Sequence, residues 1–276
     1  MKTSFVKMSG AGNDFVVVDN RDGRIQDAPT FARKVCERRF GIGADGLLLL
    51  EPSENAAFTM KYYNADGSNA GMCGNGGRCL ARFGYDLGIT GGSEFDFDAF
   101  GHRYTSRRIN EDKYELKMKD PFGLVTGQRI DVQQGTVLGN YINTGTDHSV
   151  VFMDENAWLG SLETMDVHGI GRQMRYHSVY APIGANINYI EQTGTNSIKI
   201  RTYERGVEDE TLACGTGSVA SAVLSAMKYK MKSPVAVMVR SGEVLEIGFD
   251  QEAGIFRNVR LTGSAVMTFA GIIDIE

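Results

Sequence analysis

The chain has 276 residues, of which 42% are hydrophobic, so it is long enough for one large domain or two medium ones. Its formal net charge of −5 argues against a nucleic-acid or anionic-membrane partner, which usually requires a basic surplus. The longest aliphatic run, at residues 47–50, is far too short to cross a bilayer, and no apolar stretch follows the basic first residues as in a signal peptide. We therefore expect a soluble, cytoplasmic protein.

The pattern of apolar and turn-forming residues predicts a β-rich chain with a few helices. Residues 30–39 are predicted to form a helix, with Pro29 near its start and Gly41 beyond its end. Residues 95–118 alternate as hairpins do, and a turn cluster at residues 120–123 is the candidate crossing point between two halves. Further strands are predicted over residues 15–19, 47–50, 58–63, 149–153, 187–191, 197–203, 235–240 and 259–269.

One pattern occurs twice. A strand at residues 61–63 leads to Cys73-Gly74-Asn75-Gly76, and a strand at residues 201–203 leads to Cys214-Gly215-Thr216-Gly217. Small and apolar residues follow each copy, at 78–83 and 218–227, as is typical of a buried helix. Two such units, about 140 residues apart, indicate a duplicated domain that faces itself across a cleft.

The other cysteines and glycines favour less specific interpretations. Cys36 and Cys79 lie within predicted helices and are expected to be small buried hydrophobes. The four cysteines and four histidines show no metal-ligand spacing, so no metal site is expected. Residues 41–46 match a dinucleotide-binding pattern letter for letter, but the required order of strand and helix is reversed there.

A cysteine at the start of a helix indicates a reactive thiol. The first turn of a helix offers unpaired N–H groups and a positive dipole end, which favour the thiolate of Cys73 and of Cys214. Adjacent glycines let a substrate carboxylate reach the backbone. Two facing sites of this kind suit stereoinversion, in which one thiolate removes an α-proton and the opposite thiol delivers another. Such a reaction needs neither a cofactor nor a metal.

The motifs in combination resemble the diaminopimelate epimerase family over nearly the whole chain. They are KMSGAGNDF at 7–15, RFGIGADG at 39–46, YNADGS at 63–68, MCGNGGR at 72–78, and YERG with TLACGTG at 203–206 and 211–217. Proline and hydroxyproline racemases share the paired Cys-Gly arrangement, but typically carry a histidine where this chain has Asn75.

The resemblance implies an α+β fold of two similar domains, each a β-barrel-like sheet wrapped around a central helix, with the active site in the cleft between them. We expect residues 1–119 with 264–276 to form the N-terminal domain, and residues 120–263 to form the C-terminal domain. The family implies a homodimer that interconverts LL- and meso-2,6-diaminopimelate in lysine and peptidoglycan precursor biosynthesis.

The resemblance also implies roles for individual residues. Cys73 and Cys214 would be the acid–base pair, supported by His148 on the Cys73 side and by Glu204 near Cys214. The substrate would contact Asn13, Asn64, Gly74, Asn75, Asn186, Glu204, Arg205, Gly215 and Thr216. A distal zwitterionic end requires a cation and amide acceptors, which Arg205 and the asparagines can supply.

Three segments depart from the family pattern. The chain has Gly145-Thr146-Asp147-His148 where the family usually has Gly-Asn-Pro-His, a loop longer by one residue at 208–209, and an apolar stretch at 182–185. An epimerase for another amino acid is therefore an alternative. From other classes, the chain could be a non-catalytic amino-acid binder, a protein switched by a Cys73–Cys214 disulfide, or a thiol hydrolase, which would need more than a lone His148 as base.

Overall fold

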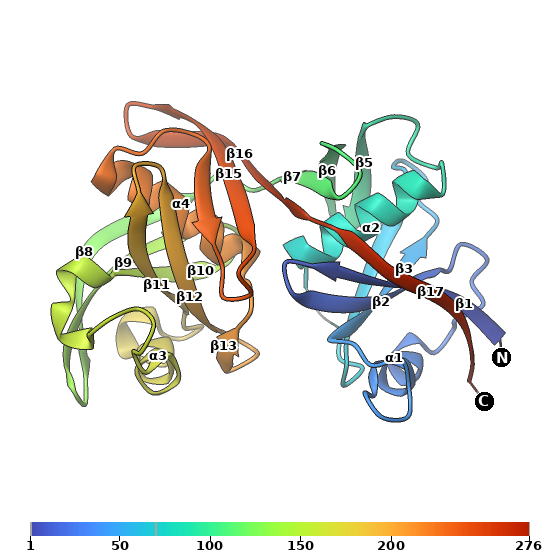
Figure 1. The fold of residues 1–276 in the computed structure, drawn as a ribbon, viewed down its shortest axis with the longest axis horizontal. Coiled ribbons are helices and arrows are strands. Elements are labelled where there is room, and N and C mark those ends of the chain that lie inside the picture. The colour runs from blue at the N-terminus through green and yellow to red at the C-terminus, as the bar shows by residue number, and fades with distance from the viewer. Residues whose placement is uncertain (1, 70, 276) are drawn as a thin grey trace. The chain divides into compact units, whose positions relative to one another are not determined.

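The computed structural model describes residues 2–69 and 71–275. The chain divides into two compact units, each with its own sheet and central helix (Figure 1). Unit 1 comprises Met1–Lys117 and Thr262–Glu276, and unit 2 comprises Met118–Leu261. The sequence puts the corresponding divisions at residues 119/120 and 263/264, two residues later in each case.

Unit 1 is a curved sheet around helix α2 (Gly74–Asp86). The strands are β1 (Lys2–Gly10), β2 (Asn13–Asp19), β3 (Gly46–Glu51), β4 (Thr59–Asn64), β5 (Glu94–Ala99), β6 (His102–Arg108), β7 (Lys113–Lys117) and β17 (Val266–Asp274). Antiparallel pairing joins β17–β1–β2, β3–β4 and β5–β6–β7, whereas β2–β3 and β4–β5 are parallel. Helix α1 (Ala28–Cys36) packs on β3 and β4.

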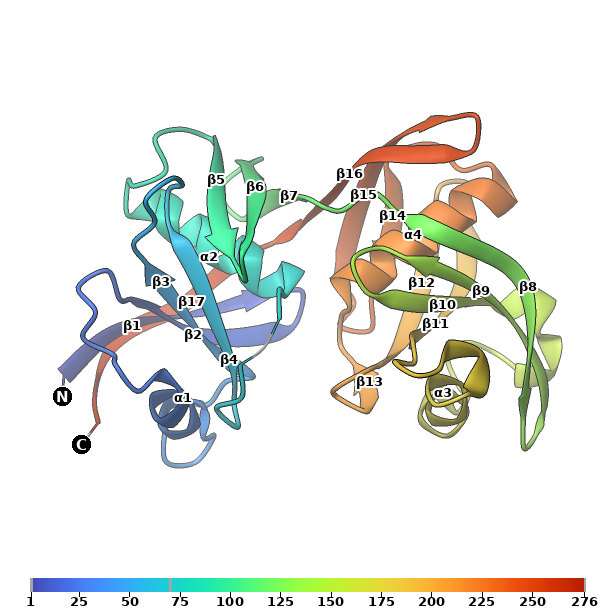
Figure 2. The same cartoon turned by 180° about the vertical axis from the view of Figure 1, so that it is seen from behind.

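Unit 2 places helix α4 (Gly215–Tyr229) against a second curved sheet (Figure 2). The strands are β8 (Phe122–Val132), β9 (Gly135–Asn143), β10 (Asp147–Phe152), β11 (Asn186–Gly194), β12 (Ser197–Glu204), β13 (Asp209–Thr211), β14 (Val235–Met238), β15 (Val244–Glu252) and β16 (Ile255–Ser264). The last residues of β16 belong to unit 1. The 3₁₀ turns η1 (Met153–Glu155), η2 (Ala157–Leu159) and η3 (Ser178–Tyr180) and helix α3 (Val167–Arg175) lie between β10 and β11.

The two units repeat the same series of strand pairings. In unit 2, β10–β11 and β12–β14 are parallel, as β2–β3 and β4–β5 are in unit 1. Antiparallel β11–β12 and β14–β15 correspond to β3–β4 and β5–β6. In both units the central helix lies between the third and fourth strands of this series, α2 between β4 and β5 and α4 between β12 and β14. This correspondence agrees with the repeat in the sequence, and the predicted α+β class is confirmed.

Small residues allow each sheet to close on its helix. A Cβ at Gly77 would lie 2.6 Å from the side chain of Met72, and one at Gly84 would lie 2.7 Å from Phe58. Helix α4 is rich in Ala, Ser and Val, and its residues 217–226 are all buried. A helix that is buried on all sides has to be apolar or small all round, which is what the sequence of α4 provides.

The strand predictions hold, apart from the last one, and the first helix is shorter than expected. Helix α1 ends at Cys36 rather than Arg39, because Glu37 is extended and the carbonyl of Val35 accepts from Ile42 and Gly43. The strand predicted over residues 259–269 is divided at Ala265, whose N–H donates to the carbonyl of Asp112. Elements β1, α3, β8, β9, β13 and β15 were not predicted.

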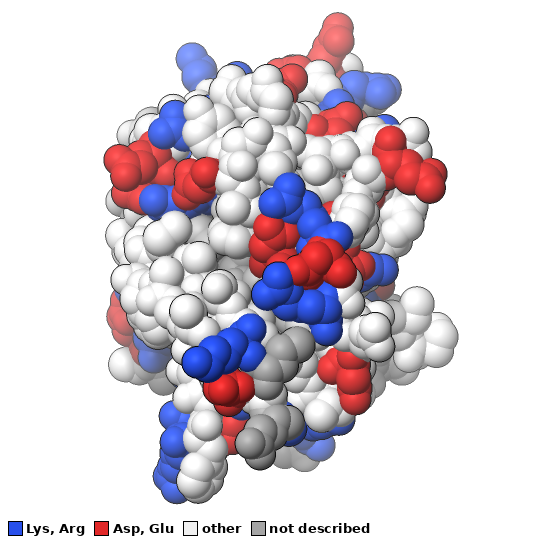
Figure 3. All heavy atoms as spheres, turned by 90° about the vertical axis from the view of Figure 1, so that its right-hand side faces the viewer, with Lys and Arg blue, Asp and Glu red and all other residues white. Residues whose placement is uncertain are grey.

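One face of the molecule is mixed in charge. Lys and Arg side chains lie among Asp and Glu side chains on the face shown in Figure 3, without a region of a single sign. Within the part of the chain that is described, no helix is long and apolar enough to cross a membrane.

Candidate active site

Cys73 occupies the N-cap position of α2. Its backbone is extended, with φ −107° and ψ 119°, and its carbonyl accepts the first helical hydrogen bond, from Gly77. Cys73 is partly exposed. The next backbone N–H groups of α2 belong to Gly74 and Asn75, and they lie in the first turn, where helical partners are lacking.

Buried polar residues fix the first turn of α2. Asn75 donates to Asn13 Oδ1 at 2.6 Å and accepts from Arg78 at 2.9 Å. Arg78, which is fully buried, also donates to the carbonyls of Gly74 and Ser264. Asn13 in turn donates to Asp45 at 3.2 Å. The predicted contacts Asn13, Gly74 and Asn75 are thus brought together beside Cys73, whereas Arg78 was quoted in a motif and given no role.

Cys214 has the equivalent position in unit 2. It is the N-cap of α4, with φ −117° and ψ 111°, and its carbonyl accepts both the N–H and the hydroxyl of Ser218 at 2.9 Å. Its sulfur lies 3.7 Å from the Thr216 hydroxyl. Cys214 is 7% exposed as a residue and is thus more enclosed than Cys73. The predicted contacts Gly215 and Thr216 form the first turn of this helix.

We call each Cys-Gly-x-Gly motif, together with the side chains around it, a half-site. Glu204 belongs to the half-site of Cys214. The carboxylate accepts a hydrogen bond from the Thr211 hydroxyl at 2.8 Å and another from the Cys214 thiol. Burial raises the pKa of Glu204, and these two hydrogen bonds act against that rise. A carboxyl group in contact with the sulfur can exchange a proton with it or hold its S–H direction. Thr211 lies within a quoted motif but was not expected to have this role.

The strand register shows that Glu204 and Asn64 are equivalent positions. Gly46 of β3 pairs with Asn64, the last residue of β4. In unit 2, Ile187 pairs with Tyr203, which puts Asn186 opposite Glu204, the last residue of β12. Asn64 donates to Ser68 at 3.0 Å in the loop that leads toward Cys73. Each half-site therefore has a polar side chain at the strand end that precedes its Cys-Gly-x-Gly motif, neutral in one unit and acidic in the other.

His148 is fully buried, and its hydrogen bonds define its tautomer. Asn188 donates to the carbonyl of Ser149 and accepts from Thr202, so its Nδ2 group faces His148 Nδ1, at 3.1 Å. Burial, and then the charge of Arg205, lower the pKa of His148 to about 3, so the ring is neutral. The proton is therefore assigned to Nε2, which donates to the Thr146 hydroxyl at 2.9 Å.

Arg205 and Asn186 form a connected cluster with Asp147. Arg205 Nη1 donates to Asp147 Oδ2 at 3.2 Å and to the carbonyl of Gly184 at 3.1 Å, and its backbone N–H donates to Asn186 Oδ1 at 2.9 Å. Asn186 Nδ2 donates to the carbonyl of Asp147 at 2.9 Å and to Thr146 at 3.4 Å. The two predicted substrate contacts are thus side by side, and Asp147, which was given no role, joins them.

Asp147 is held as a carboxylate. Burial acts to raise its pKa, but hydrogen bonds from Tyr141, Asn143 and Arg205 outweigh burial, and the pKa lies below its ordinary value. The sequence feature that could have identified Asp147 is its position directly before His148. Asn188 could have been identified as an amide in an otherwise apolar predicted strand.

The longer loop is also ordered by hydrogen bonds. Glu208 has a left-handed backbone, with φ 60°, and its carboxylate accepts from Gly206 N–H and from Arg175 of α3. Its own N–H donates to the carbonyl of Glu204 at 2.8 Å. The additional residue thus ties the Glu204 turn to α3.

The other two cysteines lie outside both half-sites. Cys36 and Cys79 are 2% and 0% exposed, as expected of small buried hydrophobes. Burial raises the pKa of Cys36 to about 12, so its thiol stays protonated. Residues 41–46 lie after α1 and before β3, the reverse of the order that dinucleotide binding requires.

Solved structures share this fold at low sequence identity. A PhzF-family phenazine biosynthesis protein from Bacillus anthracis superposes with a TM-score of 0.73 at 15% identity, and the match covers 100% of both chains. A probable proline racemase from Agrobacterium radiobacter K84 has a TM-score of 0.70 at 15% identity, over 99% of this chain and 93% of that one. At these identities the likeness establishes the fold alone.

Sequence comparison identifies the family. The family model described as Diaminopimelate epimerase matches residues 5–120 and 140–268. The diaminopimelate epimerase of Chlorobaculum tepidum is 41% identical over 270 residues, covering 97% of this chain and 100% of that protein. That of Aquifex aeolicus is 39% identical over 284 residues, covering 99% and 98%.

These similarities, together with the fold, define the chain as an isomerase. It belongs to the diaminopimelate epimerase family, as the motifs in its sequence indicated.

Proposed function

We propose that this chain interconverts LL- and meso-2,6-diaminopimelate by a two-base mechanism in which Cys73 and Cys214 act on opposite faces of one α-carbon. The observation that carries the proposal is the repetition of one arrangement, a thiol at the N-cap of a central helix, in both units. The family model and the diaminopimelate epimerase relatives support the substrate. The reaction requires no cofactor and no metal.

In the proposed mechanism one sulfur starts as a thiolate and the other as a thiol. The thiolate takes the α-proton, and the electrons of the C–H bond delocalise onto the substrate carboxylate. The opposite thiol then gives its proton to the other face of the carbon, which forms the new C–H bond and leaves that sulfur as the thiolate. Backbone N–H groups of Gly74, Asn75, Gly215 and Thr216 stabilise the charge that builds up on the carboxylate.

Two further residues support the chemistry indirectly. Glu204 holds the S–H group of Cys214, to which it is hydrogen-bonded. His148 was expected to assist on the Cys73 side. Because its ring is fully buried and neutral, we propose that it acts through the Thr146 hydroxyl, which accepts from Nε2 and is left to donate its own hydrogen outward.

The distal amino-acid end of the substrate is assigned to residues from both units. Arg205 supplies the cation for the distal carboxylate, and Asn13 and Asn64 supply amide groups. Asn186 orients Arg205 through the bond from the Arg205 backbone N–H.

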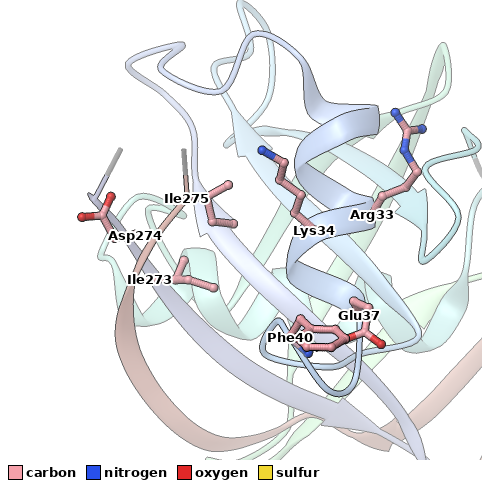
Figure 4. Close-up of a pocket in the computed structure, with 7 residues that line it drawn as sticks. All are labelled: Arg33, Lys34, Glu37, Phe40, Ile273, Asp274 and Ile275. Atoms are coloured by element: carbon pink, nitrogen blue, oxygen red, sulfur yellow. The ribbon is translucent and has the colours of Figure 1, made fainter.

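We further propose a homodimer that works in the cytoplasm, in lysine and peptidoglycan precursor biosynthesis. Strand β17 exposes Met267, Phe269 and Ile272, at 39%, 50% and 70%, and an apolar strand of this kind suits a contact between copies. Nearby, a hollow of about 500 Å³ lies between α1 and the C-terminal segment, and Phe40 is 93% exposed beside it (Figure 4).

The substrate assignment is tested by offering LL-diaminopimelate to the purified protein and following its conversion to the meso isomer. Cys73→Ala and Cys214→Ala should each reduce inversion more than 100-fold, because acid–base groups contribute about 10²–10⁴ in rate. Cys36→Ala is the matched control, since its thiol lies outside both half-sites, and it should retain activity. No conversion by the unaltered protein, or full activity of either variant, would contradict the proposal.

A further inference from the structure

One carboxylate beside Arg205 has no part in the mechanism proposed above. Asp147 Oδ1 accepts from the Tyr141 hydroxyl at 2.6 Å and from Asn143 at 3.0 Å, which fixes the orientation of the group. The other oxygen, Oδ2, therefore faces Arg205 Nη1, at 3.2 Å. The two side chains are 21% and 24% exposed, so a solute can reach both.

The guanidinium of Arg205 is engaged on one side and open on the other. Nη1 donates to both Asp147 and the carbonyl of Gly184. Nε and Nη2 have no hydrogen-bond partner among residues 2–69 and 71–275. These two N–H groups form the parallel edge that binds a carboxylate in bidentate fashion.

The side-chain amide of Asn186 is occupied by hydrogen bonds within the protein. Asn186 Oδ1 accepts from the Arg205 backbone, and Nδ2 donates to the Asp147 carbonyl and to Thr146. Two acceptors converge on the Arg205 side chain, Asp147 Oδ2 and the Gly184 carbonyl. An ammonium group carries three donors and needs acceptors of this kind.

We propose that Asp147 is a specificity-determining residue that binds the ammonium group of the distal amino-acid end, while the open edge of Arg205 binds the carboxylate of that end. This proposal rests on the proposed function, which supplies a substrate with a second zwitterionic end. All of the residues involved belong to unit 2.

The adjacent opposite charges select for a zwitterion. An arginine alone attracts any carboxylate, with or without an amino group beside it. A carboxylate next to the arginine attracts the ammonium and repels a carboxylate that lacks one, so it discriminates between the two ligands. Because the pair is partly buried, both effects are stronger than they would be in bulk water.

The test compares two substrates that differ only in the distal amino group. LL-diaminopimelate carries it, and 2-aminopimelate, the same seven-carbon diacid with a single amino group, does not. The measured quantity is kcat/KM for exchange of the α-proton with heavy water, or, where 2-aminopimelate turns over too slowly, its inhibition constant against diaminopimelate. Asp147→Asn should lower kcat/KM for diaminopimelate about 10- to 100-fold, mainly through KM, since hydrogen bonds to charged groups are strong. The values for 2-aminopimelate should not worsen by more than about threefold and should tend to improve, because the substitution removes the repulsion between Asp147 and its distal carboxylate.

Control variants separate the possible results. Arg205→Gln should weaken both ligands, and Asp154→Asn, which removes an ion pair with Lys228 elsewhere in unit 2, should change neither. Equal losses for both ligands in Asp147→Asn would overturn the proposal in favour of a carboxylate that only holds Arg205 in place. Unchanged values for both ligands would also overturn it. If the unaltered protein did not turn over diaminopimelate, that result would contradict the proposed function and, with it, this inference.

Discussion

The duplicated motif provides a matched pair of substitutions with different expected effects on stability. Gly76 and Gly217 are the last glycines of the two Cys-Gly-x-Gly copies. A Cβ at Gly217 would lie 2.3 Å from Asn188 Oδ1 and 3.3 Å from the sulfur of Cys214. A Cβ at Gly76 would lie 3.1 Å from a methyl group of Leu48. The first contact is with a side chain that is hydrogen-bonded on all sides, and the second is with the flexible end of an apolar one.

The magnitudes follow from these contacts. Alanine is favoured over glycine in a helix by about 1 kcal/mol, which applies to both variants. In Gly217→Ala, overpacking costs about 1–3 kcal/mol, and displacement of Asn188 weakens its bonds to Thr202 and His148, at about 1 kcal/mol each. We expect a net destabilisation of about 2–4 kcal/mol, or roughly 6–12 °C in the unfolding midpoint of unit 2. Gly76→Ala should stay within about 1 kcal/mol of the unaltered protein.

Chemical denaturation with both variants, together with the rate of epimerisation, checks this reasoning. Gly217→Ala should lose stability and, because Cys214 and His148 are displaced, most of its activity. Equal stability of the two variants would refute the argument, because it would mean that Asn188 can move without loss.

Three further predictions concern single buried groups. Burial raises the pKa of Glu204 above 4.5, so the folded state binds its proton more tightly than the unfolded state. The resulting stability is present below pH 4.5 and is lost as the pH rises through the folded pKa. In a Glu204→Gln variant, the unfolding free energy measured by denaturation at several pH values should lack this fall with rising pH. The same fall in the variant would contradict the assignment to Glu204. Nitrogen NMR of His148 should show a neutral ring protonated at Nε2 with no titration between pH 5 and 8; a titration midpoint near 6.5 would contradict the lowered pKa, and a neutral ring protonated at Nδ1 would contradict the assigned tautomer. Arg78→Met should destabilise unit 1 by about 3 kcal/mol in denaturation, because it leaves Asn75 and two carbonyls without their buried donor; a loss below about 1 kcal/mol would argue against that role.

Local sequence patterns predicted the strands well and the helix ends less well. A short aliphatic run bounded by turn residues, such as the one at residues 47–50, predicts a buried strand, and β3 forms there. The end of helix α1 was predicted three residues too late, because it depends on carbonyl bonds to the loop at residues 42–44. Helix α3 was missed, since its nine residues contain two glycines and its N-cap is a single aspartate, Asp166.

The residues that carry chemistry were easier to predict than those that orient them. Cys73 and Cys214 stood out because the same motif occurs twice. Asn188 and Arg78 did not, because their roles come from strands and turns that are distant in the sequence. Asp147 lay next to a predicted site residue, but its pairing with Arg205 depends on how the β12 turn folds back toward β10.

The two-base mechanism is tested most directly by the isotope content of both stereoisomers early in the reaction. LL-diaminopimelate is incubated with the protein in heavy water and sampled below about a tenth of full conversion. If Cys73 and Cys214 act on opposite faces, the meso product carries deuterium at the inverted carbon and the recovered substrate carries none. Product that keeps the original proton, or substrate that gains deuterium as fast as the product forms, would show that one base serves both faces and would contradict the account.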